Sequence, residues 1–257
     1  PQGKAPVVMV LPILGGSNDI AEMFARHFAA NGYAAVLVHR QTQYKRLTAL
    51  TDLNPTLIQI VIDHRQAIDW IETRPELDAD RIVVFGVSMG GIKAALISAV
   101  ERRIKASVLV LAGGDIPYIL THSEEADIVE RRRQLMQKEG LSRAGLYRHL
   151  SRVITADPLR LAPYIDARKT LLILGRYDTI VPYVTGENLR RSIGKPETIY
   201  LTAGHYTAAL YTPFVKYQAT RFFNSHIGNH QVSAPPLTRQ ARMTPEEQDL
   251  GGGEVAD

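Results

Sequence analysis

The sequence contains no cysteine, and this absence excludes three kinds of chemistry. Among its 257 residues there is no thiol to form a disulfide, to act as a thiolate nucleophile or to bind a metal. Long apolar runs are also missing, because no stretch approaches the roughly 18 apolar residues of a membrane-spanning helix. A strong charge of one sign is absent as well. The net charge of +4 is too small to indicate a nucleic-acid partner.

The composition that is present is that of an ordinary folded protein. Hydrophobic residues make up 45% and charged residues 22%, close to globular averages, so the composition suggests neither a disordered nor a fibrous class. The length suits one large α/β domain with a full hydrophobic core. The chain starts at Pro1 and its first strand-like run follows at once, so we expect a truncated N-terminus. Compartment and oligomeric state are left open.

Short β-branched runs alternate with longer amphipathic segments along most of the chain. This alternation predicts right-handed crossovers and a mostly parallel, doubly wound α/β sheet. The expected strands cover residues 7–11, 34–38, 81–87, 107–112, 170–174 and 197–201. The expected helices cover residues 20–31, 54–73, 90–100, 182–193 and 206–226.

One internal segment breaks this alternation. Residues 115–165 contain no strand-like run, and they predict a charged helix over 124–139 and a basic one over 143–154. We interpret 115–165 as a helical cap inserted into a core made of 1–114 and 166–227. The apolar residues expected to pack on the core or line a pocket are Tyr118, Ile119, Leu120, Leu141, Leu146 and Tyr147. A roof of helices predicts faster hydrolysis of short and medium acyl esters than of long-chain ones.

The last segment, 228–257, has no apolar periodicity and contains three consecutive glycines at 251–253. This composition predicts a flexible C-terminal tail.

A G-x-S-x-G pentapeptide occupies residues 86–90, with Ser88 at its centre. An apolar strand runs directly into it and a helix-forming segment runs out, which is the context of a nucleophile elbow. Gly86 and Gly90 are needed because the turn closes only where neighbouring side chains are absent. The pattern predicts that Ser88 is a nucleophile set at a helix N-terminus.

A serine hydroxyl needs a base within hydrogen-bond reach. His205 directly follows the last expected strand, in Ala203-Gly204-His205, so it lies at the same carboxyl edge of the sheet as Ser88. His39 and His122 are weaker competitors near a strand end and in the cap. The other histidines fall within helices or near the C-terminus: His27, His64, His149, His226 and His230.

The base in turn needs an acid to fix its tautomer. Asp178 follows the strand at 170–174, and the chain order serine, aspartate, histidine fits the hydrolase pattern. Asp115 stands in the analogous place after the preceding strand and is the alternative acid. A turn or cap role is a common use of either aspartate.

These motifs resemble those of the α/β-hydrolase superfamily, over residues 7 to about 226. The matching stretches are 11–17, 86–91, 174–182 and Gly204-His205. The resemblance implies an oxyanion hole made by the backbone amides of Leu14 and Met89. Pro12 and Ile13 stand where the family has a His-Gly pair, so Ile13 or Gly15 is an alternative donor. The hairpin that usually precedes the first parallel strand is absent from the sequence.

The function implied is hydrolysis of a small-molecule carboxylic ester through an acyl-enzyme on Ser88, without a metal or organic cofactor. An aspartate nucleophile is typical of dehalogenases and epoxide hydrolases and a cysteine of dienelactone hydrolases, so Ser88 argues against both. The alternatives are an amide or peptide hydrolase of the same fold and a non-catalytic binding protein. A nucleotide site is discounted because Gly15-Gly16 lacks the surrounding phosphate-loop pattern.

Overall fold

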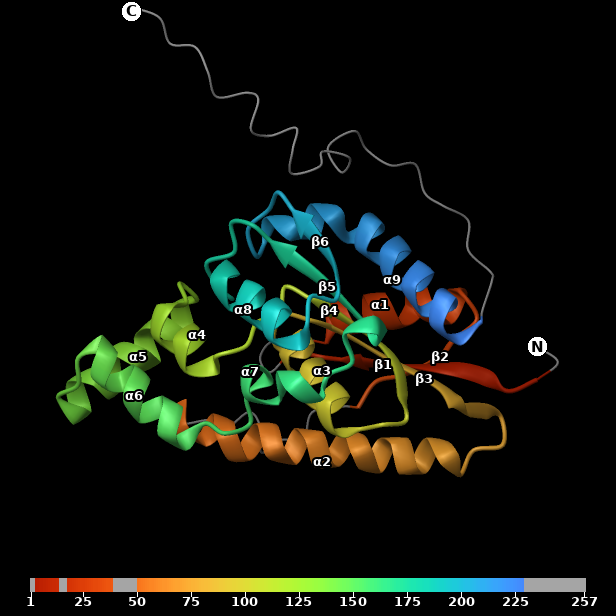
Figure 1. Cartoon of the computed structure of the whole chain (residues 1–257), viewed down its shortest axis with the longest axis horizontal. Helices are drawn as coiled ribbons and strands as arrows, with labels where there is room; N and C mark the ends of the chain where they lie inside the picture. Colours follow the sequence, from red (N-terminus) through yellow and green to blue (C-terminus); the bar gives the residue numbers. More distant parts are fainter. Residues whose placement is uncertain (1–2, 14–17, 39–49, 229–257) are drawn as a thin grey trace, which may run out of the picture.

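The computed structural model describes residues 3–13, 18–38 and 50–228. Within these ranges, six strands form one sheet in the order β2-β1-β3-β4-β5-β6, and every neighbouring pair is parallel (Figure 1). The strands are β1 (Ala5–Leu11), β2 (Ala34–Val36), β3 (Leu77–Val87), β4 (Ile104–Val110), β5 (Thr170–Gly175) and β6 (Glu197–Leu201). The predicted mostly parallel sheet is therefore confirmed, whereas the predicted tail lies outside the described residues.

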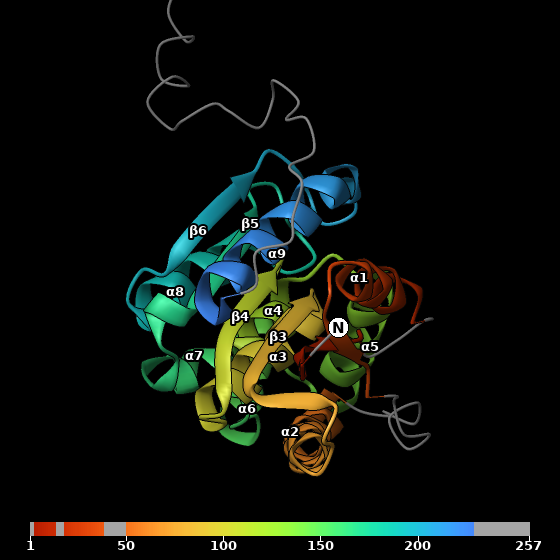
Figure 2. The ribbon, with the colours of Figure 1, turned by 90° about the vertical axis from the view of Figure 1, so that its right-hand side faces the viewer.

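The helices cover both faces of this sheet. The chain moves from β1 outward to β2 and then back across β1 to β3, so right-handed crossovers place the two connecting helices on opposite faces. Helices α1 (Asp19–Ala30) and α9 (Thr212–Ile227) lie on one face, as Figures 1 and 2 show. Helices α2 (Leu53–Glu72), α3 (Met89–Val100) and α8 (Tyr183–Ile193) lie on the other. The fold is doubly wound.

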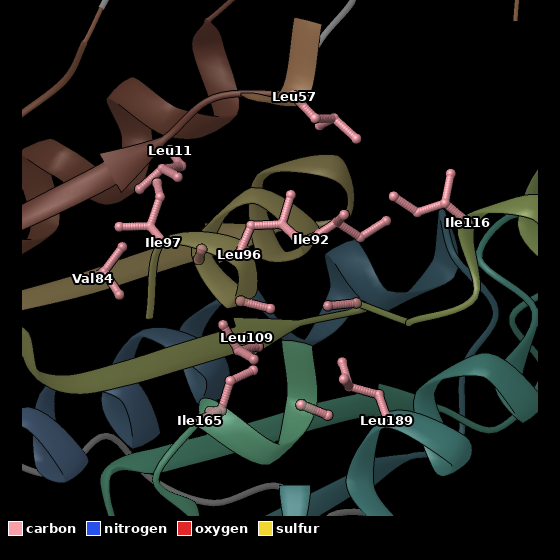
Figure 3. Close-up of a cluster of buried hydrophobic side chains, with 14 of the residues drawn as sticks. Leu11, Leu57, Val84, Ile92, Leu96, Ile97, Leu109, Ile116, Ile165 and Leu189 are labelled. Atoms are coloured by element: carbon pink, nitrogen blue, oxygen red, sulfur yellow. The ribbon is translucent and has the colours of Figure 1, made fainter. Parts of the chain in front are cut away.

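Each face has its own hydrophobic core. Phe24, Phe28 and Phe223 bring α1 and α9 together over β3 at one face. On the opposite face, Leu57 of α2 and Ile92 of α3 belong to a larger cluster, part of which is drawn in Figure 3. These two cores hold the carboxyl ends of the strands in fixed positions, and the loops that follow them share one edge.

Several boundaries differ from the expected ones for local reasons. β3 starts at Leu77 and not at residue 81, because Leu77 and Asp78 pair with the start of β1 before an irregularity in register. β4 ends at Val110, since Leu111 takes a positive φ of 50°. The closing helix begins at Thr212, where Pro213 fits the first turn, and residues 207–211 form a 3₁₀ helix.

The segment between β4 and β5 consists of helices joined by short loops and contains no strand. The charged and basic helices predicted there are confirmed as α5 (Ala126–Glu139) and α6 (Arg143–Val153). A short helix, α4 (Ile116–His122), precedes them and was not predicted; α7 (Pro158–Leu161) and two 3₁₀ helices, η3 (Ala162–Tyr164) and η4 (Ala167–Lys169), follow. Helices α4, α5 and α6 lie together at the end of the molecule opposite the N-terminus (Figure 1). Within the described ranges, the helices are too short or too polar to cross a bilayer.

Candidate active site

Ser88 sits on a strained turn between β3 and α3. Its backbone has φ 55° and ψ −123°, a conformation that costs an ordinary residue free energy. The turn is held by the Ser88 amide, which donates to the Val110 carbonyl oxygen at 2.8 Å. A Cβ on Gly86 would overlap the carbonyl of Gly90, and one on Gly90 would overlap the carbonyl of Leu11. Both glycines therefore have the mechanical role expected from the sequence.

The three side chains predicted to work together are in contact. His205 Nε2 lies 2.9 Å from Ser88 Oγ, and His205 Nδ1 lies 2.7 Å from Asp178 Oδ2. The Asp178 side chain is 2% exposed and that of His205 is 11% exposed. The pattern fits an imidazole that donates from Nδ1 to the carboxylate and accepts the serine hydroxyl at Nε2.

Asp178 is held in place by the turn after β5. Its Oδ1 accepts hydrogen bonds from the amides of Ile180 and Val181, both at 2.9 Å. Because these amides occupy one carboxylate oxygen, the other is left facing His205. The loop after β5 therefore both buries the acid and orients it.

The alternative acid, Asp115, has different partners. It takes a left-handed conformation with φ 59° and caps α4 by accepting from the Tyr118 amide at 3.1 Å. Its second oxygen accepts from the Tyr147 hydroxyl at 3.1 Å, which links α4 to α6. Asp115 therefore acts as a helix cap, one of the two roles, turn or cap, that its place after a strand allowed.

The competing histidines have partners of their own. His122 stacks on Tyr118 with ring centroids 3.8 Å apart. His64 is buried in α2, where burial lowers its pKa to about 4, and His27 contacts Thr220 of α9 at 2.9 Å. His39 and His230 lie outside the described residues.

Of the two amides expected to form an oxyanion hole, only that of Met89 belongs to a residue that the structure describes. Met89 is the first residue of α3, where the helix provides no acceptor for a backbone N–H. Leu14 and the alternative donor Gly15 lie outside the described residues. Ile13, the other alternative, lines the same cavity as Ser88.

A cavity of about 950 Å³ opens over Ser88 and His205. Ile119 and Leu120 of α4 and Ile128 of α5 line it, so the segment between β4 and β5 contributes to its wall. The lining also includes residues from α1, the start of α2 and the start of α9. The site is a large, mostly apolar chamber, and its position matches the sheet edge expected from the motifs.

The other apolar residues of 115–165 pack elsewhere. Leu146 of α6 is fully buried in the larger core cluster, and Leu141 packs against that cluster. Tyr118 and Tyr147 have the partners described above. Leu141 and Leu146 thus pack on the larger core, Ile119 and Leu120 belong to that core and also line the pocket, and the contacts of Tyr118 and Tyr147 described above lie within the segment itself.

A contact between the α4–α5 connection and the His205 loop could not be read from the sequence. The Tyr206 hydroxyl donates to Glu125, which raises the pKa of Tyr206. The Tyr206 ring meets the His205 ring edge-on at 5.6 Å, and the Glu124 amide donates to the Thr179 carbonyl at 3.1 Å. The start of α5 is therefore tied to both loops that carry the candidate base and acid.

Two further buried residues were missed. Asp157 Oδ1 accepts from the Asp115 amide at 2.9 Å and its Oδ2 from the Ile116 amide, which fixes the start of α4. Its place before Pro158 is a helix-cap signal that could have marked it. Lys93 of α3 is 1% exposed and donates to the Pro12 carbonyl, joining the elbow helix to the end of β1.

A model of the dienelactone hydrolase family matches residues 1–129 of the 257 residues. The chain belongs to the dienelactone hydrolase family. It is accordingly a hydrolase of the α/β-hydrolase superfamily, as the motifs indicated. The prediction that Ser88 disfavours this family was wrong, since the matched residues 1–129 include Ser88.

Solved structures support the fold. Acetyl xylan esterase from Paenibacillus sp. R4 is 24% identical, with 87% of this chain and 75% of that chain covered and a TM-score of 0.67. Acetyl xylan esterase 1 from Thermoanaerobacterium sp. JW/SL YS485 is 20% identical, with 84% and 76% covered and a TM-score of 0.57. Acylaminoacyl peptidase from Pyrococcus horikoshii is 15% identical, with 91% and 39% covered and a TM-score of 0.66. No curated protein matches the sequence.

Proposed function

We propose that this member of the family hydrolyses small-molecule carboxylic esters with Ser88 as nucleophile, His205 as general base and Asp178 as supporting acid. The observation that carries the proposal is the unbroken hydrogen-bonded chain from Ser88 Oγ through His205 to Asp178. No metal or organic cofactor is required for this chemistry.

In the proposed first half-reaction, Ser88 Oγ attacks the ester carbonyl carbon while His205 Nε2 takes the hydroxyl proton. The tetrahedral intermediate carries its negative charge on the former carbonyl oxygen, and we assign the stabilisation of this charge to the backbone amides of Met89 and Leu14. When the intermediate collapses, the bond to the alcohol oxygen breaks and His205 returns the proton to the alcohol. The product left on the protein is an acyl ester of Ser88.

Deacylation repeats these steps with water. His205 takes a proton from a water molecule as the water oxygen attacks the acyl carbon, and it then protonates Ser88 Oγ as the acid leaves. Asp178 stabilises the imidazolium in both halves and stays ionised. In this scheme residues 115–165 act as a cap over the core formed by 1–114 and 166–227.

A fluorophosphonate probe tests the nucleophile. We expect labelling of one residue, Ser88, and we expect Ser88→Ala to lose both labelling and ester turnover. Ser225→Ala, on the exposed side of α9, is the matched control and should label like the parent protein. Labelling at a different serine would refute the assignment, and an unlabelled protein would favour the non-catalytic binding alternative.

A further inference from the structure

The cavity over Ser88 is much larger than a small ester needs. Its volume of about 950 Å³ lies near the top of the range, roughly 300–1,000 Å³, of pockets that enclose drug-sized ligands. A small acetyl ester would leave most of this space to water, in contact with apolar walls. The size therefore favours a substrate with a substantial hydrocarbon part.

The apolar lining is divided between the two faces of the sheet. Met23 and Phe24 of α1 and Val215 of α9 belong to or pack against the core on one face. Leu53 of α2 and Ile128 of α5 belong to or pack against the core on the opposite face. Ser88 stands between these walls, because its neighbour Val87 packs against the first core and its neighbour Met89 packs against the second.

The charged lining residues are concentrated at one place. Among the described residues that line the cavity, Glu125, Asp127 and Arg131 are the charged ones, and all three lie within or just before the first two turns of α5. Glu125 is engaged by the Tyr206 hydroxyl. Elsewhere along the cavity wall, a charged substrate group would have no charged partner. Burying such an unpaired charge in an apolar pocket costs free energy.

From these observations we infer that the preferred substrate is an uncharged ester with a bulky apolar group on each side of its carbonyl. The inference rests on the proposed ester hydrolysis. The acyl and alcohol parts diverge from the carbonyl carbon, so a carbonyl held at Ser88 directs one part toward the α1–α9 wall and the other toward the α2–α5 wall. Each wall then buries one hydrocarbon group.

Four esters of matched intrinsic reactivity test the inference. They are ethyl propanoate, 2-cyclohexylethyl propanoate, ethyl 3-cyclohexylpropanoate and 2-cyclohexylethyl 3-cyclohexylpropanoate, with acid release followed by pH-stat. Burying a methylene improves binding roughly fourfold, so a ring that is even partly buried should raise kcat/KM by about tenfold or more. We expect that gain from either ring alone and a further gain from both together.

Two substitutions assign the rings to the walls. Met23→Trp narrows the α1 side and Ile128→Trp narrows the α5 side, and both positions are half-buried. Each variant should reduce the increase in kcat/KM that one of the two cyclohexyl rings gives by about threefold or more. The ring affected by Met23→Trp should not be the ring affected by Ile128→Trp. Val129→Trp is the matched control, since Val129 is exposed on α5 and does not line the cavity.

The outcomes separate this inference from the function on which it rests. Ser88-dependent hydrolysis of ethyl propanoate with no gain from one or both rings would overturn the two-sided cavity and leave ester hydrolysis standing. Loss of the same ring preference in both tryptophan variants would overturn it as well. Failure to hydrolyse all four esters, together with absent fluorophosphonate labelling, would instead reject the proposed function.

Discussion

The two oxygens of the Asp178 carboxylate have different partners, and this makes the residue sensitive to a change of a single atom. Oδ1 accepts from the amides of Ile180 and Val181, while Oδ2 faces His205 Nδ1. In Asp178→Asn the amide nitrogen must meet either two backbone donors or the imidazole N–H. If the amide nitrogen faces the backbone amides of Ile180 and Val181, two hydrogen bonds are lost. If it faces His205 Nδ1, it favours the wrong tautomer of the imidazole.

We therefore expect Asp178→Asn to lower kcat by about 10³- to 10⁴-fold with little change in Tm. Asp115→Asn is the matched control, since Asp115 caps α4 and contacts Tyr147. It should change kcat by less than about threefold and lower Tm slightly. Steady-state kinetics and thermal unfolding of both variants check the expectation, which a reversal of the two kinetic effects would contradict.

The side chains that meet at Ser88 could be predicted because each directly follows a parallel strand. The carboxyl ends of such strands share one edge, so Ser88, Asp178 and His205 could be brought together without knowing the packing of any helix. The bond from Tyr206 to Glu125 could not be predicted in this way. It depends on where α5 begins relative to the His205 loop, and no strand fixes that position.

At the scale of elements, the elbow depends on a close approach between α3 and β1. The Cβ of an alanine at position 90 would overlap the Leu11 carbonyl oxygen, so the two elements would have to separate. We expect Gly90→Ala to destabilise the fold by about 1–3 kcal/mol and to slow fluorophosphonate labelling of Ser88 by at least tenfold.

Gly145→Ala provides the control for that substitution. Gly145 lies inside α6, where the nearest atom to an added Cβ is 3.4 Å away. The exchange should stabilise the protein by about 0.5–1 kcal/mol, because alanine is the better helix former, and it should leave labelling unchanged. Urea unfolding and labelling rates measure both effects. Equal labelling in the two variants would show that the elbow tolerates the displacement.

The existence of most elements followed from hydrophobic periodicity, but some of their limits did not. β3 reaches back to Leu77 because Leu77 and Asp78 pair with Ala5 and Pro6 of β1, although aspartate has a low strand propensity. Helix α4 has only seven residues, too few to show a hydrophobic periodicity, and its start signals, Asp115 as N-cap and Pro117 in the first turn, were overlooked. Its start is fixed by Asp157, about forty residues later in the chain.

At the scale of the whole molecule, the volume over Ser88 is a property of several elements together. Residues of α1, α2, α4, α5 and α9 bound the cavity. The residues that line it are spread along the chain from Ile13 to Val215. Each of these apolar residues is equally consistent with core packing when read in sequence. The sequence could therefore predict the chemistry at the strand ends, whereas the size and shape of the substrate site required the assembled structure.

Acid stability is a second property of the whole molecule, and we expect one buried carboxylate to contribute to it. Glu101, at the end of α3, has a side chain that is 5% exposed and accepts from Arg103 at 2.7 and 2.8 Å. Arg103 also donates to Asp69 and Glu72 of α2, so the cluster joins α2 to the turn before β4. The hydrogen bonds from Arg103 lower the pKa of Glu101 to about 2.

Because the folded pKa of Glu101 lies below its ordinary value of 4.5, the ionised group stabilises the fold above about pH 5. That stabilisation, on the order of 3 kcal/mol, should be lost as the pH falls from about 4.5 toward 2. We expect Glu101→Gln to be less stable than the parent at pH 7 and to lose less stability between pH 5 and pH 3. Glu197→Gln, which removes an exposed pair with Arg221, should keep the parent's pH dependence. Urea unfolding from pH 3 to 7 measures all three proteins, and parallel curves for the parent and Glu101→Gln would show that the cluster does not control acid stability.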